Sequence, residues 1–419
     1  MNVIIVGGGI GGFTLALCLH RAGIGCRVFE AAPVLRPLGV GINVLPHASR
    51  ELAALGLESA LTRVSVLTQE AAFFNRFGQL IYREPLGRDA GYADPQYSIH
   101  RGALLDVLAG VTRERLGEAA VLTGWKCVGV AQDARGATAS FTDATSGAAR
   151  PPQHADVIVA CDGLHSVVRK ALHPDEGPPL YSGVNMWRGV TEWPPILTGA
   201  SMIRAGWLAT GKMVIYPIRD TQGGRQLVNW VAEIETPRDS TRDWNRSGRL
   251  GDFIGAFANW HFDWLDVPAF LRAAESVLEF PMVDQDPLPW WSKGRVTLLG
   301  DAAHPMVPRG SNGAGQAILD ARALTDALVA HDDPVAALAA YEAKRLPFTA
   351  AVVHANRTNP PDAILREVWQ RTGDRPFARI EDVISDTELA SMSERYKRVA
   401  GADRATLASI HPIHSKGVP

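Results

Sequence analysis

The sequence predicts an α/β fold in which a parallel sheet is assembled from separated segments, with a mostly antiparallel sheet inserted between them. The first thirty residues form a predicted β-α-β unit, in which a glycine-rich turn separates an apolar strand from an apolar helix. Its elements are expected at residues 3–6, 13–22 and 26–30. Two further short apolar strands, 156–160 and 294–301, each end in a turn that contains aspartate and glycine.

The segments between these strands are short, rich in β-branched and aromatic residues, and bounded by turn formers. We expect mostly antiparallel strands at 121–130, 137–143, 184–192, 201–205, 213–218 and 226–235. The stretch 144–154 is polar and rich in Ala, Gly and Pro, which predicts a turn. Helical spacing follows over 316–329 and 334–357, with a break expected at Pro347.

Composition excludes several classes of protein. The 419 residues carry 42 basic and 44 acidic side chains, so a broadly basic nucleic-acid binder is excluded. There is no run of 18 apolar residues and no secretory signal pattern, so we expect no membrane span and a cytoplasmic location. No C-x-x-C spacing occurs, which predicts no metal site and four reduced thiols, at Cys18, Cys26, Cys127 and Cys161.

Nine of the 11 tryptophans lie between residues 187 and 291, within the predicted antiparallel sheet. Large flat side chains are compatible with an aromatic binding pocket. Most of them are better explained as core or surface-packing residues, because tryptophan contributes much of the buried area in protein interiors.

The turn after the first strand has the pattern G-x-G-x-x-G at Gly7, Gly9 and Gly12. The first glycine fits a tight turn, the second lets the backbone approach a pyrophosphate, and the third allows close packing of helix and strand. The N-terminus of the following helix offers free N–H groups to phosphates. Glu30 closes the second strand, where it fits an adenosine ribose and repels a 2′-phosphate. The motif therefore predicts FAD or NAD rather than NADP.

Two further motifs follow, Asp162-Gly163-x-x-Ser166-x-x-Arg169 and a Gly-Asp-Ala-Ala-His-Pro stretch over 300–305. Each alone fits a common strand-end turn, but the three motifs in this order are far more specific. On these motifs the chain resembles the class A, single-component flavoprotein aromatic monooxygenases with the para-hydroxybenzoate hydroxylase fold, over about residues 1–350. Four stretches are similar to phenazine-modifying members of that family, namely 36–43, 95–102, 186–192 and 281–284.

The resemblance implies a Rossmann-type, GR2-like FAD-binding domain with an inserted, mostly antiparallel substrate sheet and C-terminal helices. The FAD-binding domain is expected over 1–175 and 281–350, with some substrate-domain strands within 65–100. The substrate-binding sheet domain is expected over 176–280, and a C-terminal helical segment over 351–419.

The resemblance also implies a set of cofactor contacts. They are Gly9, Gly11, Gly12, Glu30, Ala31, Val40, Arg101, Val128, Asp162, Gly163, Asp301, Asn312, Gly313 and Ala314. The last three would direct backbone N–H groups at flavin N1 and O2. A helix expected to begin at about Gly315 would support them, since its positive end stabilises an anionic reduced flavin.

Three residues are implied in catalysis. Pro305 would lie beside the reactive flavin carbon C4a. Arg188 and Tyr216 lie on inserted strands, from which they could contact the substrate, and the alternative is that both are ordinary sheet residues. Arg188 is suited to orienting a substrate carboxylate. His304 is interpreted as a structural neighbour of the flavin turn rather than a general base.

The implied activity is hydroxylation of an aromatic or N-heteroaromatic ring by FAD, NADH or NADPH, and O₂, through a flavin C4a-hydroperoxide. At a carboxyl-bearing carbon of a phenazine-type substrate, hydroxylation would expel CO₂. Baeyer–Villiger oxidation or N-oxygenation with the same cofactor stays an alternative, as do an NAD-dependent dehydrogenase and a non-catalytic flavin protein. The expected partners are small molecules, without nucleic acid or membrane, for a monomer or homodimer.

Overall fold

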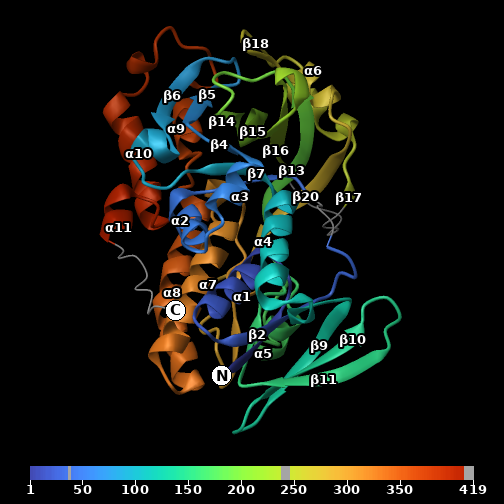
Figure 1. Ribbon diagram of the computed structural model, residues 1–419. Coiled ribbons are helices and arrows are strands. Elements are labelled where there is room, and N and C mark those ends of the chain that lie inside the picture. The colour runs from blue at the N-terminus through green and yellow to red at the C-terminus, as the bar shows by residue number, and fades with distance from the viewer. Residues whose placement is uncertain (36–38, 237–245, 410–419) are drawn as a thin grey trace. The chain divides into compact units, whose positions relative to one another are not determined.

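The computed structural model describes residues 1–35, 39–236 and 246–409 (Figure 1). The chain forms two compact units, and each unit is built from three separated segments. Unit 1 comprises Met1–Gly39, His100–Ser182 and Val283–Asn356, and unit 2 comprises Val40–Ile99, Gly183–Met282 and Arg357–Pro419. The mixed α/β architecture confirms the predicted fold class, and the expected domain boundaries stay a prediction.

Unit 1 contains a five-stranded sheet whose neighbouring strands all run parallel, in the order β21-β12-β1-β2-β8. Apolar residues predominate in the central strands β1 and β12, because a parallel sheet is covered on both faces. In β1, Val3 to Val6 are all buried, as are all four residues of β12. The strands are β1 (Asn2–Val6), β2 (Gly25–Glu30), β8 (Val121–Thr123), β12 (Val157–Ala160) and β21 (Val296–Leu298).

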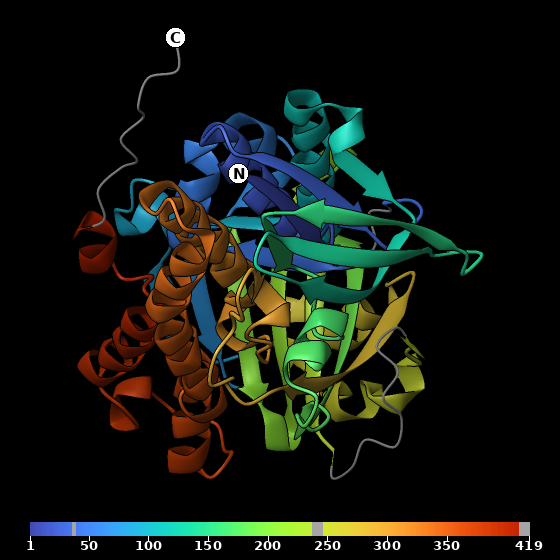
Figure 2. The ribbon, with the colours of Figure 1, turned by 90° about the horizontal axis from the view of Figure 1, so that it is seen from below.

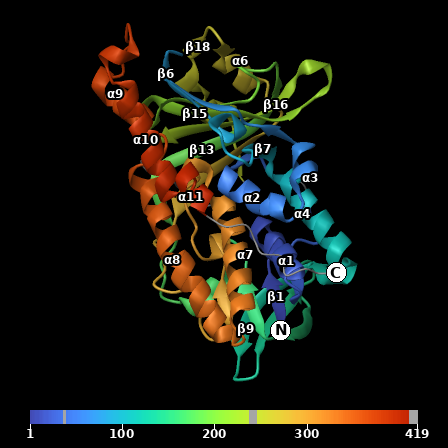
Figure 3. The same ribbon diagram turned by 60° about the vertical axis from the view of Figure 1, so that its left-hand side comes forward.

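Helices contact one face of this sheet, where α1 packs on β1 and β2 and also contacts α4 and α7. The two long helices α7 and α8 run side by side (Figure 3). The helices of unit 1 are α1 (Ile10–Arg21), α4 (Arg101–Leu116), α5 (Val167–Leu172), α7 (Gly313–Ala330) and α8 (Pro334–Thr358), whose last two residues belong to unit 2. The predicted first helix and its two flanking strands are therefore confirmed.

A three-stranded antiparallel sheet, in the order β11-β10-β9, also packs against the parallel sheet (Figure 2). Its strands are β9 (Trp125–Gln132), β10 (Ala137–Asp143) and β11 (Ala149–Ala155). The contact is aromatic: the ring of Phe29 stacks on Phe141 at 4.6 Å between centroids, and Trp125 meets both rings edge-on.

Three local expectations are wrong. The strand expected at 121–130 is divided, because β8 pairs with β2 in parallel and β9 begins at Trp125. The stretch 144–154 is not a turn throughout, because β11 begins at Ala149. Pro151 and Pro152 are tolerated there because β11 is an edge strand, on which a missing N–H leaves no partner unsatisfied. Pro347 does not break the helix, since α8 continues through it to Thr358.

Unit 2 is built on an eight-stranded sheet in the order β17-β20-β13-β16-β15-β14-β5-β6. Most neighbours are antiparallel, as predicted, and β14 pairs with β5 in parallel. Its strands are β5 (Glu70–Phe74), β6 (Leu80–Pro85), β13 (Leu180–Trp193), β14 (Ser201–Trp207), β15 (Gly211–Asp220), β16 (Gln226–Glu235), β17 (Arg246–Ser247) and β20 (Val277–Asp284).

Smaller elements complete unit 2. One minor sheet contains β3 (Gly41–Val44), β4 (Ser65–Leu67) and β7 (Tyr97–His100). The other contains β18 (His261–Phe262) and β19 (Leu265–Asp266). The helices are α2 (Pro46–Ala54), α3 (Glu58–Thr62), α6 (Val267–Arg272), α9 (Ala363–Thr372), α10 (Asp386–Val399) and α11 (Arg404–Ser409). No helix in the described parts of the chain is both long and apolar enough to cross a membrane.

The tryptophans of the middle region mainly fill the core on one face of the eight-stranded sheet. Trp187, Trp230 and Trp260 are buried there among phenylalanines, and Trp187 stacks on Phe253 at 5.1 Å. Packing in this core therefore explains why tryptophans are concentrated in this part of the sequence. Trp244 lies outside the described residues.

The opposite face of the same sheet carries a buried cluster of four charges. The Nζ atom of Lys212 lies 3.0 Å from both carboxylate oxygens of Glu233 and also bonds to Asp362, whose other oxygen lies 3.0 Å from Nε of Arg204. Asp362 immediately precedes α9, which packs on β14 and β5. The cluster therefore fixes the C-terminal helices of unit 2 to the sheet.

Replacing Lys212 with Met should lower the free energy of unfolding by about 3–5 kcal/mol, because it leaves buried carboxylates without their cation. Chemical denaturation followed by circular dichroism measures the change. The matched control is Arg379→Met, which breaks an exposed pair with Glu381 and should have no measurable effect. Equal stability of the two variants would contradict this role of the cluster.

Candidate functional site

The three sequence motifs of unit 1 meet at one edge of the parallel sheet. The glycine turn that begins at Gly7 follows β1, and Glu30 ends β2. Asp162 and Gly163 follow β12, while Gly300 and Asp301 follow β21. Because these strands are parallel neighbours, their carboxyl ends lie side by side, where ligands bind in open α/β sheets.

Close approach of backbone explains the glycines of the first turn. Gly7 has φ +104°, and a Cβ atom there would lie 2.4 Å from the carbonyl oxygen of Cys161. A Cβ on Gly12 would lie 2.0 Å from the carbonyl oxygen of Gly7, and one on Gly11 would lie 2.8 Å from the side chain of Leu299. Gly9 differs, because nothing within the described chain lies within 4 Å of its Cβ position.

The N-terminus of α1 has the features of an anion-binding site. Its N-cap residue is Gly9, no side chain of the described residues caps it, and its first turn carries no acidic residue. The first N–H groups of a helix have no partner inside the helix and lie at its positive end. Open space at Gly9 together with these donors fits a diphosphate.

The Glu30 carboxylate is engaged with the backbone on both sides. One oxygen accepts a hydrogen bond from the N–H of Gly8 at 2.6 Å, and the other accepts from the N–H of Ala32 at 2.7 Å. These bonds hold the glycine turn against the end of β2. Each carboxylate oxygen has a second lone pair with which to accept from a ribose hydroxyl.

The Asp162 motif is joined to the Gly300 motif by Arg169. This buried guanidinium donates from Nη1 to the carbonyl oxygens of Ala302 and Ala303, at 3.0 and 2.9 Å, and pairs with Glu176. Asp162 accepts from the N–H of Val167 through Oδ2, whereas its buried Oδ1 has no hydrogen-bond partner among the described residues. Burial raises the pKa of the Asp162 carboxyl, against the hydrogen bonds that lower it.

Asp301 and the N-terminus of α7 form the other half of this edge. Desolvation by the surrounding protein raises the pKa of the Asp301 carboxyl, although its side chain stays accessible, and the charges of His304 and Arg101 oppose the shift. The helix begins at Gly313, two residues before the predicted start, and within the described parts of the chain no side chain caps it. Its first N–H groups, on Gly313 and Ala314, are therefore free of helical partners.

The remaining expected contacts of unit 1 are spread more widely. Ala31 follows β2 and is exposed, and Arg101 begins α4, with its side chain 3.7 Å from a Cβ built on Gly39. Val128 on β9 is 48% exposed, which is unusual for valine. Pro305 is buried directly after the Gly300 motif. Their cofactor roles stay predictions.

A second constellation lies within unit 2, around Gly41 on β3. Nη2 of Arg188 and the hydroxyl of Tyr216 both donate to the carbonyl oxygen of Gly41, at 2.7 and 2.8 Å. The N–H of Gly41 donates to Oδ1 of Asn229 at 2.7 Å. A Cβ on Gly41 would lie 2.7 Å from Asn229 and Ile218, so only glycine allows this approach.

Sequence reasoning missed Gly41, Asn229 and the connecting role of Arg169. The available signal was a polar residue, Asn229, inside an apolar strand that also contains Trp230. Val40, a predicted cofactor contact, is buried beside Gly41 in the sequence. Residues 36–38, which belong to one of the stretches that resemble the phenazine-modifying enzymes, lie outside the described residues.

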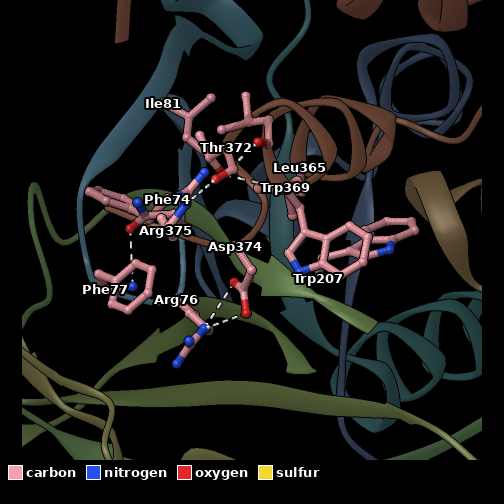
Figure 4. Close-up of a pocket in the computed structure, with 13 residues that line it drawn as sticks. Phe74, Arg76, Phe77, Ile81, Trp207, Leu365, Trp369, Thr372, Asp374 and Arg375 are labelled. Atoms are coloured by element: carbon pink, nitrogen blue, oxygen red, sulfur yellow. Dashed lines mark hydrogen bonds and ion pairs between the residues drawn. The ribbon is translucent and has the colours of Figure 1, made fainter. Parts of the chain in front are cut away.

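A separate cavity of unit 2 is too small to hold a substrate ring (Figure 4). It measures about 20 Å³ and is lined by Phe74, Trp207 and Trp369, beside the ion pair between Arg76 and Asp374 at 2.9 Å. That volume holds about one water molecule. The aromatic side chains here are therefore packing residues.

The surroundings of these glycines predict that one substitution affects FAD binding and another affects folding. Gly9→Ala should fold normally and weaken FAD binding at least about tenfold, because its methyl group occupies space open to a phosphate. Gly12→Ala should lose the fold, since its methyl group would overlap backbone. Flavin fluorescence titration and circular dichroism measure the two effects.

Gly110→Ala, in the exposed part of α4 with nothing near its Cβ position, is the matched control. It should leave FAD affinity unchanged and increase stability slightly, by roughly 0.5–1 kcal/mol. Unchanged FAD affinity in Gly9→Ala would show that the phosphates bind elsewhere.

Comparison with known proteins shows the family of the chain. The chain matches the family model described as FAD binding domain over residues 1–196 and 281–356. It is 42% identical over 404 residues to the phenazine 1,6-dicarboxylic acid hydroxylase PhzS of Lysobacter antibioticus, covering 95% of this chain and 97% of that protein. It is 37% identical over 371 residues to the 3-amino-4-hydroxybenzoate 2-monooxygenase PtmB3 of Streptomyces platensis, covering 85% and 87%.

The fold matches solved flavoproteins along nearly the whole chain. The structure of Klebsiella pneumoniae HpxO complexed with FAD and uric acid matches with a TM-score of 0.77 at 24% identity, covering 97% of this chain and 98% of that one. The predicted cofactor is confirmed as FAD, with NAD(P)H as co-substrate. The chain therefore belongs to the FAD binding domain family and is a flavin-dependent monooxygenase that hydroxylates aromatic rings.

Proposed function

We propose that this monooxygenase hydroxylates a carboxylated N-heteroaromatic ring of the phenazine type and that Arg188 binds the carboxylate. The relative from Lysobacter antibioticus, named for phenazine 1,6-dicarboxylic acid, supports the substrate class, because it aligns with 95% of the chain. The unit 2 constellation around Gly41 supports the role of Arg188.

The observation that carries the proposal is a pair of buried donors without partners. Nε of Arg188 and Nδ2 of Asn229 have no hydrogen-bond partner among the described residues. In the register of the sheet, Arg188 lies opposite Val231 and Asn229 opposite Val190, so both side chains belong to one face. An unsatisfied buried donor is costly, and a ligand carboxylate would satisfy both.

Gly41 fixes the orientation of these donors. The carbonyl oxygen of Gly41 accepts a hydrogen bond from Nη2 of Arg188, so Nε of Arg188 stays available to a ligand. The N–H of Gly41 donates to Oδ1 of Asn229, so Nδ2 of Asn229 stays available as well. Burial raises the pKa of Tyr216, against the opposing charges of Arg188 and Arg204. Tyr216 is thus a neutral phenol at neutral pH, so its O–H can donate to the carbonyl oxygen of Gly41.

When bound, FAD carries two electrons from NAD(P)H to O₂ and delivers one oxygen atom to the ring. The chain supplies binding and orientation. Arg188 and Asn229 would hold the carboxylate, and the apolar side chains on the same face, Val190 and Val214, would contact the ring and exclude water. If the carboxyl-bearing carbon is hydroxylated, one ring carboxylate, O₂, NAD(P)H and two protons yield hydroxylated ring, CO₂, water and NAD(P)⁺.

Three further parts of the function are proposed, namely the individual FAD contacts, the compartment and the oligomeric state. The individual FAD contacts and the place of Pro305 beside flavin C4a follow from the motif positions at the sheet edge. A reducing cytoplasm suits the four cysteines, which form no disulfide within the described residues. A monomer or homodimer is proposed, and light scattering coupled to size exclusion decides between them.

A substrate panel tests the proposed reaction. Phenazine, pyridine and benzene carboxylates are compared with their carboxyl-free parents for NADH and NADPH oxidation coupled to product. Mass spectrometry separates ring hydroxylation from N-oxygenation and ring insertion, and labelled carboxyl carbon reports CO₂ release. Failure of every carboxylate to stimulate coupled oxidation would reject this substrate class.

Arg188→Met should raise KM for the carboxylated substrate at least about tenfold, because a hydrogen bond to a charged group contributes about 1.5–3 kcal/mol. KM for the carboxyl-free parent should change little. Arg219→Met, at an exposed position of β15 in the same sheet, is the matched control and should behave as wild type. Equal effects on the carboxylate and its parent would assign Arg188 a structural role only.

A further inference from the structure

A buried polar cluster of unit 1 lies directly behind the proposed flavin turn. Nε2 of His304 lies 2.5 Å from Oδ2 of Asp320, and Nε of Arg345 donates to Oδ1 of Asp320 at 2.7 Å. Nη2 of Arg345 donates to Oε1 of Gln316 at 2.7 Å. All four side chains are almost completely buried, so their charges are poorly screened by solvent.

The cluster is bonded to both backbone segments that are proposed to contact the flavin. The N–H of Gly300 donates to Oδ2 of Asp320 at 3.1 Å, and His304 follows Asp301 in the same turn. Gln316 belongs to the first turn of α7, where its N–H donates to the carbonyl oxygen of Asn312. The cluster therefore connects the Gly300 turn to the N-terminus of α7.

The charges of the cluster act on this edge of the sheet. Desolvation raises the pKa of the Asp301 carboxyl overall. The charge of Asp320 adds to this increase, and the charge of His304 opposes it. Burial also raises the pKa of Asp320, but His304 and Arg345 outweigh it and lower that pKa to about 2. Asp320 is thus ionised at neutral pH and paired with Arg345.

We propose that Asp320 and Arg345 are positioning residues whose opposite charges set the reduction potential of the bound FAD. The inference rests on the proposed placement of the flavin at the N-terminus of α7. Hydride transfer from NAD(P)H gives oxidised NAD(P)⁺ and a reduced flavin with one negative charge, which nearby positive charge stabilises. Removing Arg345 therefore opposes reduction, and removing the charge of Asp320 favours it.

The expected size follows from the helix geometry. Asp320 lies seven residues after Gly313, which is about 10 Å along the helix axis. At that distance, one charge in a protein environment changes the ratio of oxidised to reduced flavin about tenfold. For a two-electron couple this corresponds to about 30 mV.

The test is the midpoint potential of bound FAD, measured by spectroelectrochemistry without substrate. Arg345→Gln should shift the potential negative by about 30 mV. Asp320→Asn should shift it positive by a similar amount, and Arg345→Lys, which keeps the charge, should stay near wild type. Opposite signs are the signature of a charge effect, since loss of packing has no reason to change sign between the two variants.

Gln316→Leu is the uncharged control, because it removes a contact of Arg345 and leaves every charge in place. A shift in Gln316→Leu as large as that in Arg345→Gln would overturn the proposal, as would shifts of the same sign in Arg345→Gln and Asp320→Asn. If Asp320→Asn fails to fold, the pair Arg345→Gln and Arg345→Lys decides alone, and equal potentials in these two overturn the proposal. The potential is independent of the substrate, so an incorrect substrate class leaves this test unaffected.

Discussion

The close approach of two backbone segments at the carboxyl ends of β1 and β12 is the constraint on which the cofactor site depends. Gly7 lies against Cys161, and Gly12 lies against Gly7, at distances that exclude any side chain. This packing places the free N–H groups of α1 beside the Asp162 turn. Arg169 then ties that turn to the Gly300 motif, so the three motifs form one connected surface although about 290 residues separate the first from the last.

Much of unit 1 was predictable from sequence because its signals are local. The strand, glycine turn and helix at the N-terminus need only hydrophobic period and glycine spacing, and the apolar strand before Asp162 was found in the same way. Family resemblance then supplied the cofactor, which composition and spacing alone left open between FAD and NAD. The individual contacts of the cofactor stay predictions.

The remainder depends on contacts between residues far apart in the chain. The sequence shows Asn229 only as a polar residue in an apolar strand, and its bond to Gly41 becomes visible only once β3 is placed. Lys212 is recognisable as buried only once Asp362 and Glu233 surround it. The strand at 149–155 was missed because Pro151 and Pro152 oppose a strand locally, and only its edge position makes them acceptable.

The alternation of the two units along the chain has a consequence for biosynthesis. Because six segments alternate, the polypeptide passes between the units five times, and neither unit is encoded as a continuous stretch. The sheet of unit 1 lacks β21 until residues beyond 290 have left the ribosome, and Lys212 in the eight-stranded sheet lacks Asp362, the second of its two carboxylate partners, until residue 362 is made. Both units are thus completed late in synthesis, so early fragments expose apolar strands and are prone to aggregate until the later segments arrive.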